Sequence, residues 1–256
     1  PRRRRPRVVL HEQNAVLGRA NRMLARLADL LVLSAAATTR VPTGARTRVI
    51  GNPVRAEIAA LAGTAYPTPS PDATLHLLVL GGSLGARALA DLVPAAVATL
   101  PDALRTRLCL TMQCRAEDVE RTRAALDGSR VTARLAPFFD DVAALYARAH
   151  LVIARAGAST VAELACAGRP SLLIPLPHAI DDHQTANARA LAAAGAAELH
   201  PQASLTPARL SASLAALLAD PPRLARMAEA AATLAQPHAA ARLADAVLAL
   251  APTEVP

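Results

Sequence analysis

The chain has 256 residues, of which 53% are hydrophobic and 2% aromatic. This length and apolar content exclude a disordered polypeptide and suffice for one large or two small domains with packed cores. The 28 basic and 20 acidic residues give a formal net charge of +8, which favours phosphate-bearing partners such as a nucleotide or an anionic lipid. A nucleic-acid partner is not expected, because the arginines are scattered and lack the interleaved aromatic residues of nucleic-acid-binding surfaces.

Three cysteines, Cys109, Cys114 and Cys166, lie among apolar residues and form no CxxC pair. This arrangement is typical of buried reduced thiols and indicates a cytosolic protein. Arginine or aspartate interrupts each apolar run before it reaches the roughly 18 residues that a transmembrane helix needs. We therefore expect any contact with a membrane to be peripheral.

Apolar runs of strand length alternate with helix-length stretches along nearly the whole chain. Strands are predicted at residues 7–10, 30–34, 47–50, 75–80, 107–111, 131–135, 150–154, 171–175 and 196–199. Because helices are expected between most of them, the alternation predicts an α/β fold with a doubly wound parallel sheet.

One segment, residues 63–74, breaks this rhythm with three prolines and is predicted to be a linker between two domains. Residues 75–236 contain six strand-and-helix units, the number of a complete doubly wound sheet. Residues 1–62 have three short strands, too few to close a core, so we expect them to be the remnant of a truncated N-terminal domain. The last segment, 237–256, is expected to form a helix that crosses back to the first domain.

Polar side chains follow the first predicted strand directly, where His11, Glu12, Gln13 and Asn14 stand in sequence. Four consecutive polar residues at the carboxyl end of a strand are difficult to explain by packing. Further on, a turn that begins at Gly51 presents Arg55 next to a helix start. That arginine either neutralises a departing diphosphate or is merely solvated.

Two glycine-rich turns follow strands of the second domain. The first, residues 81–86, includes Ser83 and opens a helix, which places backbone amides and the positive end of the helix dipole at the carboxyl edge of the sheet. The second, residues 155–160, has the same position after strand 150–154. Either turn alone also fits simple packing, but two at one sheet edge favour a nucleotide diphosphate.

Glu163 follows the second turn and fits two hypotheses. It stands three residues after Thr160, so it matches the glutamate of a capping box. Alternatively, its carboxylate accepts hydrogen bonds from a ribose diol.

A third polar cluster, residues 178–187, lies between a strand and a helix, and loops of this kind hydrogen-bond sugar hydroxyls. Its two histidines, His178 and His183, and two aspartates, Asp181 and Asp182, are also types that bind metals. A metal site is not expected, because the spacing lacks the HxxxH pattern of a zinc-binding helix.

Five segments together, HEQNAVLGRANR, GNPVR, LGGSLGAR, ARAGASTVAELACAG and PLPHAIDDHQTANA, resemble the MurG family of glycosyltransferases in order and spacing. The resemblance implies a two-domain GT-B fold and inverting transfer of N-acetylglucosamine from UDP-N-acetylglucosamine to lipid I, giving lipid II in peptidoglycan synthesis. It implies no catalytic metal and no cofactor. It also implies peripheral binding to an anionic membrane surface at the cytoplasmic face of the cell membrane.

The resemblance assigns donor-binding roles residue by residue. Arg55 and the Ser83 turn would stabilise the diphosphate, and Phe139 would line the uracil pocket through its backbone. Glu163 would hold the ribose, and Gln184 with Asn187 would read the sugar. The donor-binding set is Asn14, Arg55, Ser83, Phe139, Ala158, Ser159, Thr160, Val161, Ala162, Glu163, Gln184 and Asn187.

Two departures from the family pattern limit what is expected. The family's GGH loop, which carries the proposed catalytic base, has no counterpart here, so Glu12 and His11 are the candidate catalytic residues. Leu84 replaces a glutamine in the phosphate turn. The alternatives are therefore a catalytically inactive truncated fragment that only binds a UDP-sugar, or another UDP-sugar enzyme of GT-B fold.

Overall fold

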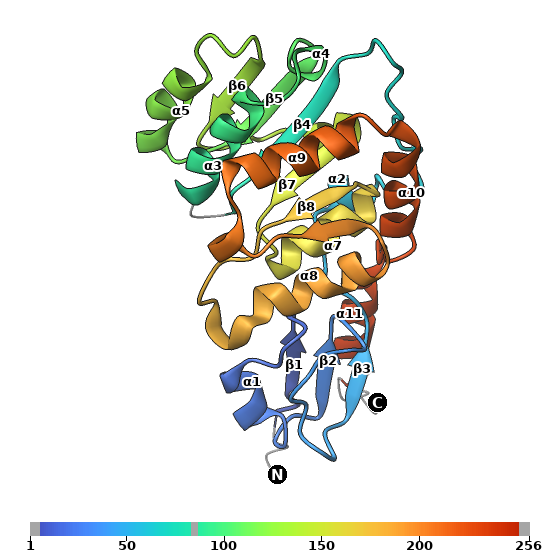
Figure 1. Ribbon diagram of the computed structural model, residues 1–256. Helices are drawn as coiled ribbons and strands as arrows, with labels where there is room; N and C mark the ends of the chain where they lie inside the picture. Colours follow the sequence, from blue (N-terminus) through green and yellow to red (C-terminus); the bar gives the residue numbers. More distant parts are fainter. Residues whose placement is uncertain (1–5, 83–86, 251–256) are drawn as a thin grey trace, which may run out of the picture.

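Each of the two lobes of the computed structural model is built on a parallel β-sheet (Figure 1). The structure describes residues 6–82 and 87–250. The first lobe has the strand order β1-β2-β3, with β1 at Val9–Glu12, β2 at Leu30–Leu33 and β3 at Thr47–Val49. The central strand β2 has the sequence LLVL and is wholly buried, as expected for a parallel strand with a neighbour on each side.

The second lobe has six parallel strands in the order β6-β5-β4-β7-β8-β9. Their bounds are Leu75–Leu80 for β4, Leu108–Gln113 for β5, Thr132–Ala136 for β6, Leu151–Ala154 for β7, Ser171–Leu173 for β8 and Ala197–Leu199 for β9. The strand order reverses between β4 and β7. Ligands of open α/β sheets bind outside the carboxyl ends of the strands at such a switch point, so the topology alone indicates where a site should lie.

Helices cover both faces of the six-stranded sheet (Figure 1). Side chains of α3, α5 and α9 share one core cluster with Leu77 and Val79, whereas α6, α7 and α8 share another with Leu78. This division follows from β4, because successive residues of a strand point to opposite faces. The helices are α1 (Arg19–Leu24), α2 (Ala56–Ala59), α3 (Arg87–Ala98), α4 (Asp102–Arg105), α5 (Val119–Leu126), α6 (Val142–Arg148), α7 (Ala158–Ala167), α8 (His183–Ala193), α9 (Pro207–Leu218), α10 (Pro221–Ala232) and α11 (Ala239–Leu248). Short 3-10 turns lie at η1 (Ala116–Asp118), η2 (Ile180–Asp182) and η3 (Gln202–Ser204).

The chain passes between the lobes twice, once after β3 and once after α10. Beyond the second crossing, α11 packs on the three-stranded sheet, where Ala239 and Ala246 join a core cluster with Leu30 and Val32. The two crossings touch at Gly51, whose φ is +100°, and a Cβ atom built there would lie 2.7 Å from Cβ of Gln236. Both the backbone conformation and the close approach therefore require glycine at this position.

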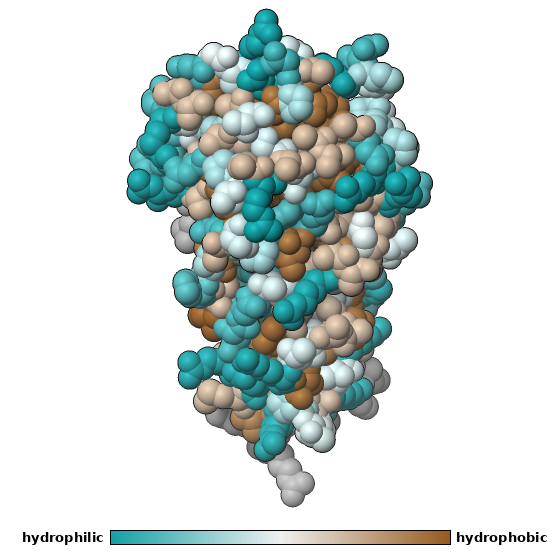
Figure 2. Space-filling view, viewed as in Figure 1, coloured by the Kyte–Doolittle hydropathy of each residue, from teal (hydrophilic) through white to brown (hydrophobic). Residues whose placement is uncertain are grey.

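The α/β class, the parallel sheets and the nine predicted strands are confirmed, although β1 is displaced from 7–10 to Val9–Glu12. No helix in residues 6–82 and 87–250 is long and apolar enough to cross a membrane. The cysteines are free thiols as expected, but Cys109 is only partly buried. On the face seen in Figure 2, apolar side chains are scattered among hydrophilic ones over both lobes.

Candidate functional site

The carboxyl ends of β4 and β7 open onto a cleft of about 680 Å³ between the two lobes. Gly81 and Gly82 line it after β4, and Gly82 has a φ of +83°, a conformation that glycine adopts without strain. Asn14 of the first lobe and Gln184 of α8 also line it. Ser83 lies outside the described residues, so its predicted role stays a prediction.

The first turn of α7 points into this cleft. Gly157 is the N-cap residue and provides no side-chain cap, and Ala158, Ser159 and Thr160 line the cleft. The backbone amides of a first helical turn have no partner within the helix, and the helix dipole places partial positive charge there. These amides would supply the anion seat that the sequence predicts at this turn, which stays a prediction.

Arg155, directly after β7, is a cleft residue whose importance the sequence analysis missed. Its side chain is 7% exposed, and its two terminal nitrogens donate to the carbonyls of Ile174 and Pro175 and to Oε1 of Gln202. Nε is buried without a partner, and no carboxylate within the described residues forms an ion pair with the guanidinium. A buried cation without a counter-charge is costly, and burial lowers the pKa of Arg155. Its place in the cleft makes an anionic ligand the natural counter-charge.

Glu12 braces the loop that carries Asn14. Its Oε1 accepts hydrogen bonds from the backbone and side-chain amides of Asn14, and its Oε2 accepts from the backbone of Gly18 and from Asn21. Burial alone raises the pKa of Glu12, but these hydrogen bonds together lower it below its ordinary value. With both oxygens occupied, the geometry favours a positioning role over proton transfer.

His11 is half-buried at the end of β1, where its Nε2 lies 3.5 Å from the hydroxyl of Ser34. Burial lowers the pKa of His11, although a hydrogen bond with the Gly51 backbone and the charge of Glu12 oppose this. The imidazole is therefore neutral near pH 7. Neither His11 nor Glu12 lines the cleft.

Asn187 of α8 joins the two lobes. Its Nδ2 donates to Oδ1 of Asn14 and to the carbonyl of Ala156, and its Oδ1 accepts from the backbone of Ala15. The side chain is buried, so its hydrogen-bonding capacity is largely used within the protein. It holds Asn14 at the cleft without lining the cleft itself.

Gln184, four residues after Ile180 in the same polar cluster, does line the cleft. Its Oε1 accepts from the backbone of Leu176 at 2.9 Å, which fixes the side chain. No hydrogen bond to its Nε2 is formed by the part of the chain that the structure describes. That amide is left to donate to a ligand.

Glu163 does not form the capping box that its spacing allows. The helix begins after Gly157, and Glu163 instead accepts hydrogen bonds from Arg55 at 3.2 Å and from the hydroxyl of Tyr146 at 3.2 Å. Phe139 is buried beside Tyr146 in the same core cluster. The capping hypothesis is thus wrong, because the N-cap of the helix is Gly157, three residues before Thr160.

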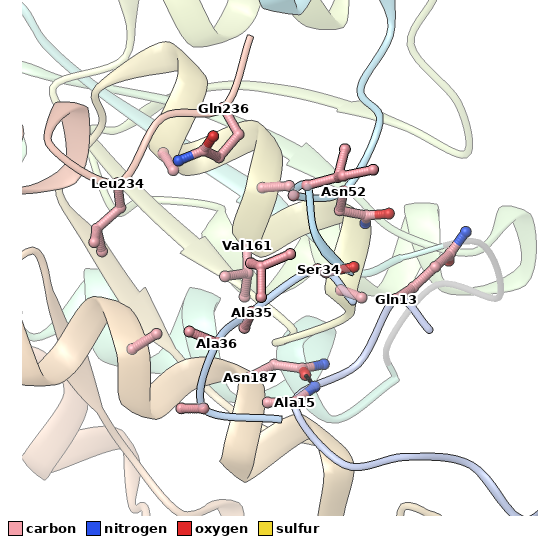
Figure 3. Close-up of a pocket in the computed structure, with 18 of the residues that line it drawn as sticks. Gln13, Ala15, Ser34, Ala35, Ala36, Asn52, Val161, Asn187, Leu234 and Gln236 are labelled. Carbon is pink, nitrogen blue, oxygen red and sulfur yellow. Dashed lines mark hydrogen bonds between the residues drawn. The ribbon is translucent and has the colours of Figure 1, made fainter. Parts of the chain in front are cut away.

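Three of the predicted donor residues line a different cavity and not the cleft. Val161 and Ala162 of α7, together with Asn187, line a second space between the lobes (Figure 3).

In the polar cluster, Asp181 contacts Arg22 at 3.5 Å and also pairs with Arg40. Among the described residues, no three His, Cys, Asp or Glu side chains gather as a metal-ligand set.

A doubly wound sheet whose paired glycine turns face a second lobe across a cleft is the architecture of a GT-B glycosyltransferase. The model for the glycosyltransferase family 28 C-terminal domain matches residues 76–243. A solved structure, that of MurG from Acinetobacter baumannii, has a TM-score of 0.80 and 36% identity, covering 95% of this chain and 68% of that one. The chain belongs to the MurG group of glycosyltransferase family 28.

Two curated relatives support the same grouping. They come from Granulibacter bethesdensis, with 61% identity over 86% of this chain, and from Acidiphilium cryptum, with 56% identity over 89%. Both are named UDP-N-acetylglucosamine--N-acetylmuramyl-(pentapeptide) pyrophosphoryl-undecaprenol N-acetylglucosamine transferase. The chain spans 58% and 61% of their lengths.

Proposed function

We propose that the chain binds UDP-N-acetylglucosamine in the cleft at the switch point and transfers its N-acetylglucosamine to the 4-hydroxyl of lipid I, giving lipid II. One observation carries the proposal: two glycine turns, the first turn of α7 and the buried Arg155 all border one cleft, which Asn14 of the other lobe closes. The names of the curated relatives point to the same reaction.

The proposed site acts mainly through charge. In an inverting transfer the acceptor oxygen attacks the anomeric carbon while the bond from that carbon to the diphosphate breaks, so negative charge develops on the departing UDP. The free amides of α7 and the guanidinium of Arg155 are already in place to stabilise that charge. Arg55, exposed and paired with Glu163, would join them once a donor engages the carboxylate.

The sugar and the ribose would be recognised by neighbouring groups. Gln184 presents its Nε2 amide to the cleft and Asn14, held by Asn187 and Glu12, presents a side-chain amide from the opposite lobe. The carboxylate of Glu163 would accept from the ribose diol. The assignment of Phe139 to the uracil pocket stands on the resemblance.

Neither of the two candidates for proton removal lines the cleft, so the choice of His11 over Glu12 rests only on its neutral imidazole. Its lowered pKa keeps the imidazole neutral and able to accept a proton. Glu12, whose oxygens receive four hydrogen bonds, would serve to position Asn14.

We further propose that the surface around α1 contacts an anionic membrane at its cytoplasmic face, where lipid I would be met. Met23, Leu24 and Leu27 are 80%, 45% and 67% exposed, and Arg19 and Arg26 beside them are also exposed. Apolar side chains flanked by arginines suit the interface of an anionic bilayer.

The test is calorimetric titration with UDP-N-acetylglucosamine, with UDP-glucose and ADP-glucose as controls, followed by a transfer assay with lipid I in anionic vesicles. Selective binding of the N-acetyl donor together with formation of lipid II supports the whole proposal. Selective binding without transfer would leave a donor-binding module and refute the catalytic part. A folded chain that binds none of the three nucleotides would refute the site itself.

A further inference from the structure

Gln202 is a cleft residue to which neither the sequence motifs nor the proposed reaction gives a role. It is the first residue of η3, shortly after β9, and it lines the cleft at the switch point. Arg155 follows β7, which β8 separates from β9. The Arg155 side chain crosses the end of β8, where Nη1 donates to the carbonyls of Ile174 and Pro175, and its Nη2 reaches Oε1 of Gln202 at 2.7 Å. Gln202 thus fixes the far end of the guanidinium.

The partners of Arg155 are all uncharged. A guanidinium can only donate hydrogen bonds, and when it is buried its usual partner is a carboxylate. Here the acceptors are two backbone carbonyls and the amide oxygen of Gln202. Glu198, on the strand that leads to Gln202, accepts instead from Arg223 and His200. Arg155 is therefore held in place by three hydrogen bonds and keeps its full positive charge.

A contact that served stability alone would be stronger with a carboxylate. Glutamate has the shape of glutamine and would offer Arg155 a charged acceptor at the same place, and charged acceptors form the stronger hydrogen bonds. The neutral amide leaves the buried charge uncompensated, which disfavours the charged form and lowers the pKa of Arg155. The amide at position 202 therefore lowers stability and leaves a positive charge at the wall of the cleft.

We propose that Gln202 is a positioning residue, which aims the guanidinium of Arg155 at an anionic ligand and leaves the charge of that guanidinium for the ligand to neutralise. The inference rests on the proposed function, in which the ligand group is the diphosphate of UDP-N-acetylglucosamine. Gln202 acts through Arg155 and takes no part in breaking or forming bonds. As UDP departs, its developing negative charge meets a cation that no side chain of the protein has neutralised.

Gln202→Glu tests the charge. At pH 7.5 the new carboxylate is ionised and pairs with Arg155. UDP affinity, measured by calorimetry, should fall at least about tenfold, whereas uridine affinity should change less than about twofold. The urea midpoint of unfolding should rise, by about 0.3 M, because the buried cation gains a counter-charge. A purely structural role for Gln202 does not produce tighter folding together with weaker UDP binding.

Gln202→Met tests the positioning. Methionine has a similar length but no acceptor that holds Nη2 of Arg155, so UDP affinity should fall by about fivefold. If Gln202 acts through Arg155, the same change made in an Arg155→Met background should alter UDP affinity by less than about twofold, since nothing is left to position. Equal losses in both backgrounds would contradict this role.

Ala203→Glu is the matched control for charge. Ala203 is the next residue of η3, is exposed and does not line the cleft. The variant has the same net charge as Gln202→Glu, but solvent screens its carboxylate. UDP affinity should stay within about twofold of the wild type. A loss equal to that of Gln202→Glu would mean that any added negative charge weakens binding, which would overturn the inference.

The wild-type titration separates the inference from the proposed function. A folded wild-type chain that binds no UDP would refute both. A wild type that binds UDP, together with a Gln202→Glu variant of unchanged UDP affinity, would refute the inference and leave the donor site standing. Equal losses of UDP and uridine binding in Gln202→Glu, with a lowered urea midpoint, would also refute it, since they would show a disrupted cleft.

Discussion

The six-stranded sheet has an amino edge, where its strands begin, and a carboxyl edge, where they end. Each edge buries an arginine, but the two arginines differ in how many of their nitrogens have hydrogen-bond partners. At the amino edge Arg169 is 1% exposed, and its nitrogens donate to the carbonyls of Tyr146, Gly168 and Ala147. Its guanidinium also lies 5.6 Å from the ring of Tyr66. At the carboxyl edge Arg155 is almost as buried, yet its Nε has no partner and its side chain borders a cleft.

This difference separates stability from function. A buried group whose hydrogen bonds are complete fixes the packing around it, whereas an incomplete one retains capacity for a ligand. His150, also at the amino edge, belongs to the first kind, because its Nδ1 accepts from the backbone of His76 and its carbonyl accepts from Tyr66. We expect substitutions at the amino edge to lower mainly the free energy of unfolding, and substitutions at the carboxyl edge to lower mainly the affinity for UDP.

The largest effect is expected for Arg169→Met. The change removes a buried charge and leaves three buried carbonyls without their donor, so the free energy of unfolding should fall by about 4 kcal/mol. Urea unfolding followed by circular dichroism measures this. UDP affinity of the variant that remains folded should be unchanged, and a loss of UDP binding with full stability would reverse the roles assigned to the two edges.

The second largest effect is expected from acid, which should lower the stability of the fold through His150 at the amino edge. Burial, followed by the nearby His76 and Arg169, lowers the pKa of His150 from 6.5 to about 4. Between those values the unfolded chain binds a proton that the folded chain refuses, so stability is complete above about pH 6.5 and falls towards pH 4. The loss from this group is on the order of 3 kcal/mol.

His150→Asn provides the control for the pH experiment. Its amide oxygen can take the place of Nδ1 and accept from His76, but it does not titrate. Denaturant melts between pH 7 and pH 4 should therefore show a shallower decline for the variant. Parallel declines would mean that other groups govern the acid response.

Arg155→Met is the carboxyl-edge counterpart of Arg169→Met. Water in the cleft can satisfy the carbonyls it leaves, so stability should fall by only about 1 kcal/mol. UDP affinity should fall by about 30-fold, close to 2 kcal/mol, because the diphosphate loses its buried counter-charge. Calorimetry with UDP and with uridine tests this, since uridine binding should not change; equal losses for both would indicate a disrupted cleft.

Glu163→Gln should have the smallest effect, because its carboxylate is paired but borders on solvent. If it holds the ribose, UDP affinity should fall by about fivefold, close to 1 kcal/mol. Binding of 2′-deoxy-UDP should fall less. An unchanged preference between the two nucleotides would remove Glu163 from the ribose site.

Much of the fold could be predicted from the sequence because its signals are local. The strand LHLLVL and the glycines after it define β4 and the turn on their own, and the same holds for β7. Strand order follows from the rules for doubly wound sheets. The exact start of β1 was less certain, because the flanking residues continue the extended pattern without a turn.

The site was predicted less completely, because it depends on which face of a helix points into the cleft. Ser159 and Thr160 reach the cleft, while Val161 and Ala162 one step further turn to the other cavity. The sequence gives the helix but not its rotation against the other lobe. Likewise, the burial of Arg155 and its missing partner exist only once β8 and η3 have packed around it.

The contact between Gly51 and Gln236 has a mechanical consequence. A lobe tethered by one strand of chain can swivel about that strand in any direction. Here two segments of chain join the lobes and are in contact with each other. They restrict the relative motion of the lobes to rotation about the axis that passes through both segments. The lobes should therefore open and close along one path, returning the same faces to each other on every cycle.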